Sequence, residues 1–154
     1  MAHRTFAPRP LANLHATVHV SRTSIRLHLC ASARAALLSG QSPERVGFAR
    51  NPVTIEGLAK GHNTVARALA DVGYDTTFFG KWHLGAESNS SPRAQGFSEF
   101  LGFYPWTISY YSHQTVTEEP GFYDDDGPVS RDGYLTDLLS DEACAFINRE
   151  RAAP

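Results

Sequence analysis

The stretch GYDTTFFGKWHLG, residues 73–85, carries the clearest fold signal in the chain. Its aromatic and β-branched part, Tyr74–Phe79, predicts a short buried strand that ends at Gly80. Directly before it, Thr64–Val72 predicts a helix with Asn63 or Thr64 as N-cap and Gly73 as its terminator. The apolar residues at helical spacing are Val65, Ala68, Leu69 and Val72. A helix that leads into a strand indicates an α/β protein with a central sheet flanked by helices.

Two further helices are expected on either side of this unit. Ala31–Ser39 is rich in Ala and Leu and is followed by Gly40, a residue typical just past a helix C-terminus. Thr136–Arg149 predicts the third helix, with apolar residues at Leu138, Leu139, Ala143, Phe146 and Ile147. The intervening Gly85–Arg131 segment holds many aromatic and turn residues, so we expect loops with short strands there.

Length and composition indicate a globular domain or part of one. The chain has 154 residues, of which 42% are hydrophobic and 19% are charged, which excludes collagen-like and plainly disordered classes. No apolar run is long enough to span a membrane. Arg22 and Arg26 interrupt the segment 16–29, so no signal peptide is visible and the compartment stays undetermined.

Charge is distributed unevenly along the chain. Residues 1–43 contain five Arg and no Asp, Glu or Lys, and four of the seven His lie before residue 29. A nucleic-acid arm, a transit peptide and a loop-rich lead-in of unclear status compete as interpretations of this segment. Five Arg over 43 residues are sparse for nucleic-acid binding, so we expect no nucleic-acid partner and treat residues 1–28 as a basic lead-in.

The two cysteines differ in their surroundings. Cys144 lies in the apolar pattern of the third helix, which predicts a small buried hydrophobe. Cys30 precedes the first helix, where free N–H groups and the helix dipole stabilise negative charge. Arg34 returns to the same helix face one turn later, which favours binding of an oxyanion.

Several segments resemble the type I sulfatases of the alkaline phosphatase superfamily, in particular the arylsulfatase and N-acetylgalactosamine-sulfatase branch. CASARAALLSG at 30–40 is similar to the first sulfatase signature, and GKWHLG at 80–85 is the core of the second. Weaker likenesses lie at 93–103, 110–113 and 133–137. The resemblance implies an alkaline-phosphatase-like α/β fold that is incomplete in this chain, with residues 29–154 forming part of an N-terminal catalytic domain.

The resemblance also implies a reaction and a site. Sulfatases hydrolyse sulfate esters, here of an aryl or carbohydrate substrate, through a formylglycine that a separate formylglycine-generating enzyme makes from the signature cysteine. Cys30 would be this precursor and, once converted, a ligand of the calcium cofactor. Arg34 would stabilise the hydrated aldehyde, Lys81 would contact the sulfate and His83 would assist proton transfer. Such enzymes are often periplasmic, secreted or lysosomal.

Two departures from the family pattern bear on this interpretation. Ser32 stands where the family motif has Pro or Ala, which bears on conversion of Cys30. Residues 1–29 hold no carboxylate for calcium, so we expect the isolated chain to be an inactive fragment. The run at 124–126 does not fit an EF-hand and predicts an acidic turn instead.

Some assignments remain open at this point. A non-catalytic remnant or anion-binding module, and a phosphodiester or phosphonate hydrolase of the same superfamily, are the alternative functions. His113, in a loop rich in Tyr and Ser, fits either a substrate cleft or an ordinary surface position.

Overall fold

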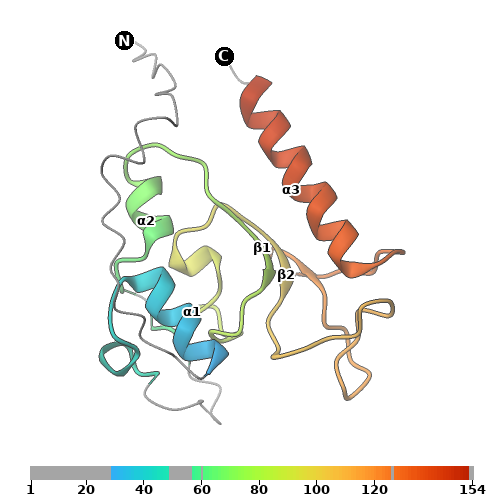
Figure 1. Cartoon of the computed structure of the whole chain (residues 1–154), viewed down its shortest axis with the longest axis horizontal. Helices are drawn as coiled ribbons and strands as arrows, with labels where there is room; N and C mark the ends of the chain where they lie inside the picture. The colour runs from blue at the N-terminus through green and yellow to red at the C-terminus, as the bar shows by residue number, and fades with distance from the viewer. Residues whose placement is uncertain (1–28, 49–56, 60, 126, 153–154) are drawn as a thin grey trace, which may run out of the picture.

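The computed structural model describes residues 29–48, 57–59, 61–125 and 127–152. A small mixed sheet lies between helix α1 (Cys30–Ser39) on one side and helix α3 (Leu135–Ala152) on the other (Figure 1). This arrangement confirms the predicted α/β class with a sheet flanked by helices. The predicted lead-in of residues 1–28 lies outside the described residues.

The sheet has the strand order β1-β2-β3-β4. Strand β1 (Thr77–Lys81) pairs in parallel with β2 (Glu99–Phe103), with Lys81 opposite Phe103. The short strands β3 (Tyr123–Asp124) and β4 (Gly127–Pro128) continue the sheet in antiparallel pairing. The predicted strand therefore exists, but it starts later than Tyr74 and runs past Gly80, because parallel pairing with β2 sets its limits.

Helix α1 packs on one face of the sheet. Its buried residues Ala31, Ser32, Ala35 and Leu38 recur at helical spacing. Together with Trp82 and Phe100, the apolar residues Ala31, Ala35 and Leu38 belong to the larger of two hydrophobic clusters. Gly40 follows in the left-handed conformation and donates its N–H to the carbonyl of Ala36, as predicted for a C-cap glycine.

Helix α2 (Val65–Ala70) is shorter than predicted and packs differently. Thr64 is the N-cap, as expected, and its hydroxyl accepts a hydrogen bond from the N–H of Arg67. The predicted apolar face is wrong, because Val65, Leu69 and Val72 are exposed and Ala66 is the buried residue of the helix. The close packing of Arg67 against Gly96 fixes which side of this helix faces inward.

Helix α3 covers the opposite face of the sheet, where Leu101, Ile108, Phe122 and Leu135 form the second buried cluster. Leu138 and Leu139 pack against this cluster, in agreement with the predicted apolar pattern. Cys144 is exposed, so its prediction as a buried hydrophobe is wrong. Its position around the helix differs from that of the leucines that face the sheet. Within the described ranges, no helix is long and apolar enough to cross a membrane.

The centre of the sheet leaves no room for a side chain at Gly102. A Cβ atom there would lie 1.9 Å from the carbonyl oxygen of Gly80 on the neighbouring strand. We therefore expect Gly102→Ala to lower the free energy of unfolding by about 1–3 kcal/mol, as overpacking usually does. Urea unfolding measures this effect, and Gly127→Ala is the control because its Cβ atom would meet its nearest atom only at 3.9 Å. Equal stability of the two variants would contradict the steric argument.

Candidate active site

The side chains predicted to carry the chemistry come together at the end of β1. The Cys30 Sγ atom lies 3.1 Å from Nδ1 of His83. The Lys81 Nζ atom donates to the same sulfur at 3.6 Å. Two side chains that lie more than fifty positions after Cys30 in the sequence therefore contact its exposed thiol.

Cys30 occupies the first turn of helix α1. The preceding residue, Leu29, has extended dihedral angles and makes no side-chain capping bond. The first N–H groups of a helix have no acceptor within the helix, and the helix dipole places partial positive charge at this end. A negatively charged group attached to Cys30 would therefore be stabilised by the helix as well as by nearby side chains.

Buried Trp82 fixes the two site residues on either side of it. Its side chain is 0% exposed, and its indole N–H donates to the Ser90 carbonyl at 2.9 Å. The backbone N–H of Trp82 donates to the Phe103 carbonyl at 2.8 Å, and the backbone N–H of His83 donates to the Tyr104 carbonyl at 3.2 Å. Lys81 and His83, on either side of this buried residue, are both partly exposed.

The backbone of His83 has a positive φ of 59°. This left-handed conformation is uncommon for a residue other than glycine, and it occurs more often at functional sites than elsewhere. The turn directs the imidazole toward Cys30 just after the strand ends. The sequence alone gave no indication of this backbone conformation.

Arg34 binds the end of the strand. Its guanidinium donates a hydrogen bond to the backbone carbonyl of Lys81. Burial lowers the pKa of Arg34, and the electrostatic attraction of Cys30 opposes this shift. The structure thus places Arg34 where it positions Lys81 and adds positive charge near the thiol.

The electrostatic surroundings favour the neutral form of His83. Burial is the largest cause of its lowered pKa, and the positive charges of Lys81 and Arg34 lower the pKa further. A neutral imidazole near pH 7 can accept a proton, which is the property required of a general base.

This lowered pKa predicts a pH-dependent stability. The unfolded chain binds a proton at His83 near the usual pKa of 6.5, whereas the folded chain binds it only at lower pH. We expect stability to be complete above this usual pKa and to fall as the pH drops from it through the lowered folded value. Replacement of His83 by Asn, which tolerates positive φ, should remove this part of the slope. Urea unfolding of both proteins between pH 5 and 8 measures it, and identical slopes would contradict the assignment.

The described residues do not form a calcium site by themselves. None of their His, Cys, Asp and Glu side chains gather in groups of three or more. The side chains that contact Cys30 carry nitrogen atoms, whereas calcium prefers oxygen ligands. Cys30, after its conversion, therefore remains the one calcium ligand that we predict among the described residues.

Within the described residues, the predicted acidic turn is found at Asp125, which follows β3 directly, whereas Asp124 belongs to that strand and Asp126 lies outside the described residues. The carboxylates of Asp124 and Asp125 both form ion pairs. Asp124 pairs with Arg131 at 2.7 Å, and Asp125 pairs with Arg93 at 2.9 Å. These carboxylates stabilise the turn, and their ion-pair partners are residues outside the Cys30 cluster.

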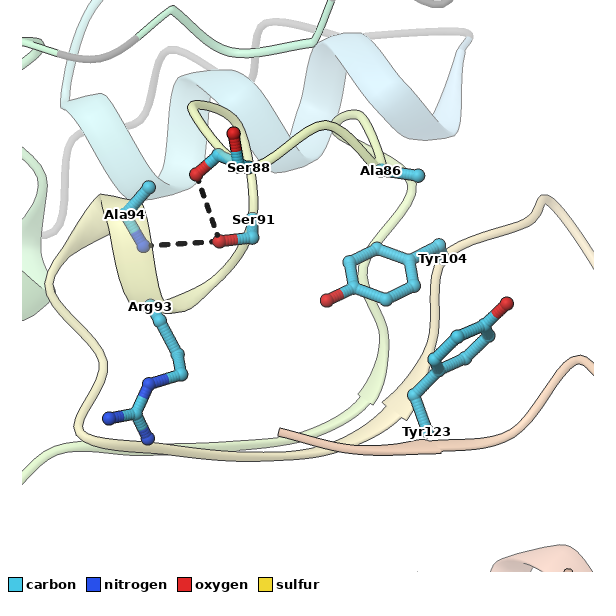
Figure 2. Close-up of a pocket in the computed structure, with 7 residues that line it drawn as sticks. All are labelled: Ala86, Ser88, Ser91, Arg93, Ala94, Tyr104 and Tyr123. Atoms are coloured by element: carbon cyan, nitrogen blue, oxygen red, sulfur yellow. Dashed lines mark hydrogen bonds between the residues drawn. The ribbon is translucent and has the colours of Figure 1, made fainter. Parts of the chain in front are cut away.

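One hollow in the described part of the structure, drawn in Figure 2, is separate from this cluster. Its volume is about 570 Å³, and its lining residues are Ala86, Ser88, Ser91, Arg93, Ala94, Tyr104 and Tyr123 (Figure 2). None of the four predicted site residues lines it. The charge of Arg93 is already paired with Asp125, so the hollow presents no free cation from this residue to an anionic ligand.

Two buried polar residues were not foreseen from the sequence. Gln95 is fully buried, and its side-chain nitrogen donates to the Leu58 carbonyl at 2.8 Å, which ties the loop after Leu84 to residues 57–59. His113 is 4% exposed and packs on Phe122, so of its two expected interpretations the ordinary surface position is wrong. The sequence QGF at 95–97 marked Gln95 as part of a family-like segment, but only the tertiary contacts show that its side chain is buried.

Comparisons with known proteins identify the family of the chain. The family model described as Sulfatase matches residues 14–154. N-acetylglucosamine-6-O-sulfatase of Bacteroides thetaiotaomicron is 32% identical over 82% of this chain and 20% of its own length. N-acetylgalactosamine-6-sulfatase of Canis lupus familiaris is 31% identical over 81% of this chain and 28% of its own. The arylsulfatase of Hemicentrotus pulcherrimus is 32% identical, with 82% and 27% covered.

Two solved structures share the fold of this chain. The crystal structure of Ps i-CgsB matches with a TM-score of 0.72 and 25% identity, covering 79% of this chain and 31% of that one. BT4656, solved with its substrate D-glucosamine-2-N,6-O-disulfate, matches with a TM-score of 0.61 and 28% identity, covering 78% and 22%.

The extent of these matches has two consequences. The chain spans between 20% and 28% of the length of the three curated relatives named above. The family match begins at residue 14, within the segment treated as a lead-in, so the boundary at residue 28 stays a prediction. Because the family model covers most of the sequence and includes both signature segments, the chain belongs to the sulfatase family.

Proposed function

We propose that the protein hydrolyses sulfate esters at the Cys30 cluster, after conversion of Cys30 to formylglycine by a separate formylglycine-generating enzyme. The observation that carries this proposal is the convergence of Lys81 and His83 on Cys30 Sγ at 3.6 and 3.1 Å, at the start of a helix. Membership of the sulfatase family supports it.

The surrounding residues have distinct roles in this proposal. Residue 30, once converted to formylglycine, would supply the nucleophilic oxygen that the reaction requires. The ammonium of Lys81 and the helix N-terminus bind the negative charge of the sulfate group, and the guanidinium of Arg34 stabilises the hydrated aldehyde at residue 30. His83, neutral because of its lowered pKa, moves a proton at the group attached to residue 30.

The proposed substrate is a sulfated carbohydrate, with aryl sulfates as simpler analogues. Two relatives are named as sulfatases of N-acetylated amino sugars, and BT4656 was solved with a sulfated glucosamine. Calcium is the cofactor that family membership implies. Its ligands other than residue 30 would have to come from outside the described residues.

Ser32 determines how the modification must be tested. It is buried and donates to the Phe48 carbonyl at 2.8 Å, so the folded helix holds the motif in a packed form. Conversion therefore requires access to the segment before or during folding.

Peptide mass spectrometry across residue 30, after coexpression with a formylglycine-generating enzyme, tests the proposal. We expect the peptide to show the mass change of a thiol replaced by an aldehyde. An unmodified thiol in every sample would exclude the formylglycine route for this protein. Ser32→Pro is the informative comparison, since it restores the family motif and Pro is tolerated in the first helical turn.

A second candidate function is anion binding without turnover. The observation that favours it is the lack of a metal-binding group among the described residues, next to a cluster that is complete as an anion site. Sulfate binding that is lost in Lys81→Ala, with no hydrolysis by the modified wild-type protein, would favour this alternative.

A further inference from the structure

Gln95 is a buried polar residue that has no role in the chemistry proposed above. Its side chain is fully buried, and its amide nitrogen lies within hydrogen-bond distance of three backbone carbonyl oxygens. These oxygens belong to Leu58 at 2.8 Å, Asn89 at 3.3 Å and Ala59 at 3.5 Å. Because all three neighbours are acceptors, the nitrogen of the amide and not its oxygen must face them.

This orientation leaves the oxygen of the amide unpaired. Gln95 Oε1 is buried and makes no hydrogen bond with the described residues. A buried acceptor without a partner carries a free-energy cost. Stability alone therefore does not account for a glutamine at this position, whereas a requirement for a donor that faces several carbonyl groups does.

One of the three carbonyl groups connects Gln95 with the residue after His83. Leu58, which accepts from Gln95, donates its own N–H to the carbonyl of Leu84 at 2.8 Å. The two backbone segments are in direct contact here, because a Cβ atom at Gly57 would lie 2.1 Å from the Leu84 carbonyl oxygen. A displacement of Leu58 would therefore displace Leu84 as well.

A second carbonyl group connects Gln95 with the residue before His83. Asn89 accepts from the amide of Gln95, and the next residue, Ser90, accepts the indole N–H of Trp82 at 2.9 Å. Trp82 is fully buried, so its indole N–H depends on this acceptor. The residues on both sides of His83 are thus connected to the same buried amide.

His83 itself has a backbone conformation that needs such support. Its φ of 59° is uncommon for a residue other than glycine and carries a free-energy cost. A conformation of this kind persists only where the surrounding structure fixes it. In this conformation His83 Nδ1 lies 3.1 Å from Cys30 Sγ, so a change of φ would move the imidazole away from residue 30.

We propose that Gln95 is a positioning residue for His83, which acts through the backbone of Leu84 and the ring of Trp82. It stabilises the left-handed turn that directs the imidazole toward residue 30. The consequence for catalysis rests on the proposed function, in which His83 moves a proton at residue 30. The effect on the geometry of His83 is independent of turnover.

Gln95→Met tests this assignment, because methionine has a similar size but cannot donate to the three carbonyl groups. Nuclear magnetic resonance of the full chain gives two readouts of His83. One is the nuclear Overhauser effect between its imidazole protons and the β protons of Cys30, and the other is the strong effect between its own HN and Hα that accompanies positive φ. We expect the variant to lose the first and weaken the second. The Leu58 amide should exchange with solvent about tenfold faster.

Thr76→Val is the matched control. Thr76 is also buried, and its hydroxyl donates to the Gly96 carbonyl at 2.8 Å. It lies just before β1, at the opposite end of the strand from His83. This variant should lower stability and keep both readouts of His83. If Gln95 had only a structural role, Gln95→Met would behave in the same way.

Wild-type readouts of His83 in a folded Gln95→Met variant would overturn the assignment. If the variant does not fold, hydrogen exchange of the wild-type protein in low urea decides instead. The Leu58 amide and the Trp82 indole N–H should open in one step, and separate opening would contradict a common support. Failure of the proposed function has a different signature. In that case residue 30 stays a thiol after coexpression with the modifying enzyme, while Gln95→Met still displaces His83.

Discussion

Replacement of Cys30 by alanine should reduce sulfate ester hydrolysis at least about a thousandfold, because it removes the precursor of the proposed nucleophile. The structure places this side chain at the centre of the cluster, within 3.1 Å of His83 Nδ1 and 3.6 Å of Lys81 Nζ. Remaining binding groups cannot compensate for a missing nucleophile. Because the isolated chain is expected to be inactive, the loss is measured in a longer protein that contains this segment and supplies the missing calcium ligands. Initial rates with an aryl sulfate and with N-acetylglucosamine 6-sulfate, after coexpression with the modifying enzyme, give its size.

The second cysteine provides a matched control. Cys144 is also a free, exposed thiol, but it lies on α3 outside the candidate site. Cys144→Ala should therefore keep the wild-type rate and leave the modification at residue 30 intact. A Cys30→Ala variant that retains more than a few percent of the activity would show that another residue provides the nucleophile.

The largest effect on stability is expected for Trp82→Ala, which should lower the free energy of unfolding by about 3–5 kcal/mol. Trp82 is fully buried, and its ring makes edge contacts with Phe78 at 5.2 Å and with Phe97 at 6.2 Å. Its loss would leave a cavity and remove the hydrogen bond to Ser90, whose backbone N–H bonds back to Glu87. Urea unfolding followed by far-UV circular dichroism measures the change.

Trp106→Ala is the appropriate control for this experiment. Trp106 is mostly exposed, so its removal should change stability by less than about 0.5 kcal/mol. Trp82→Phe should recover part of the lost stability, since it keeps an aromatic ring but not the indole N–H. Similar stability for the two alanine variants would show that Trp82 does not organise the segment from Lys81 to Leu84 as described.

Both signature segments could be located from the sequence because their residues are local. The run from Cys30 to Gly40 has the composition and terminal glycine of a helix, and the structure contains it with nearly the predicted limits. The alternation of Lys81, Trp82 and His83 could also be read from the sequence. The structure buries the middle residue and leaves its two neighbours partly exposed.

Predictions that depended on packing partners were less successful. Periodicity placed Val65, Leu69 and Val72 on a buried face, yet all three are exposed, because contact with Gly96 turns the helix another way. Cys144 shared the apolar pattern of its helix but not the face that the leucines direct toward the sheet. A periodic pattern specifies that a face exists, whereas the neighbouring elements decide which residues it contains.

By itself, the sequence determined the type of the main elements, the α/β class and the identities of the side chains that could carry out the chemistry. These properties follow from local spacing and residue type. The tertiary structure alone decided that Cys30 Sγ and His83 Nδ1 lie 3.1 Å apart and that His83 has a positive φ. It also decided that Arg34 donates a hydrogen bond to the Lys81 carbonyl at the end of β1. These features depend on parallel pairing of β1 with β2 and on packing of α1 against Trp82, which join segments far apart in the chain.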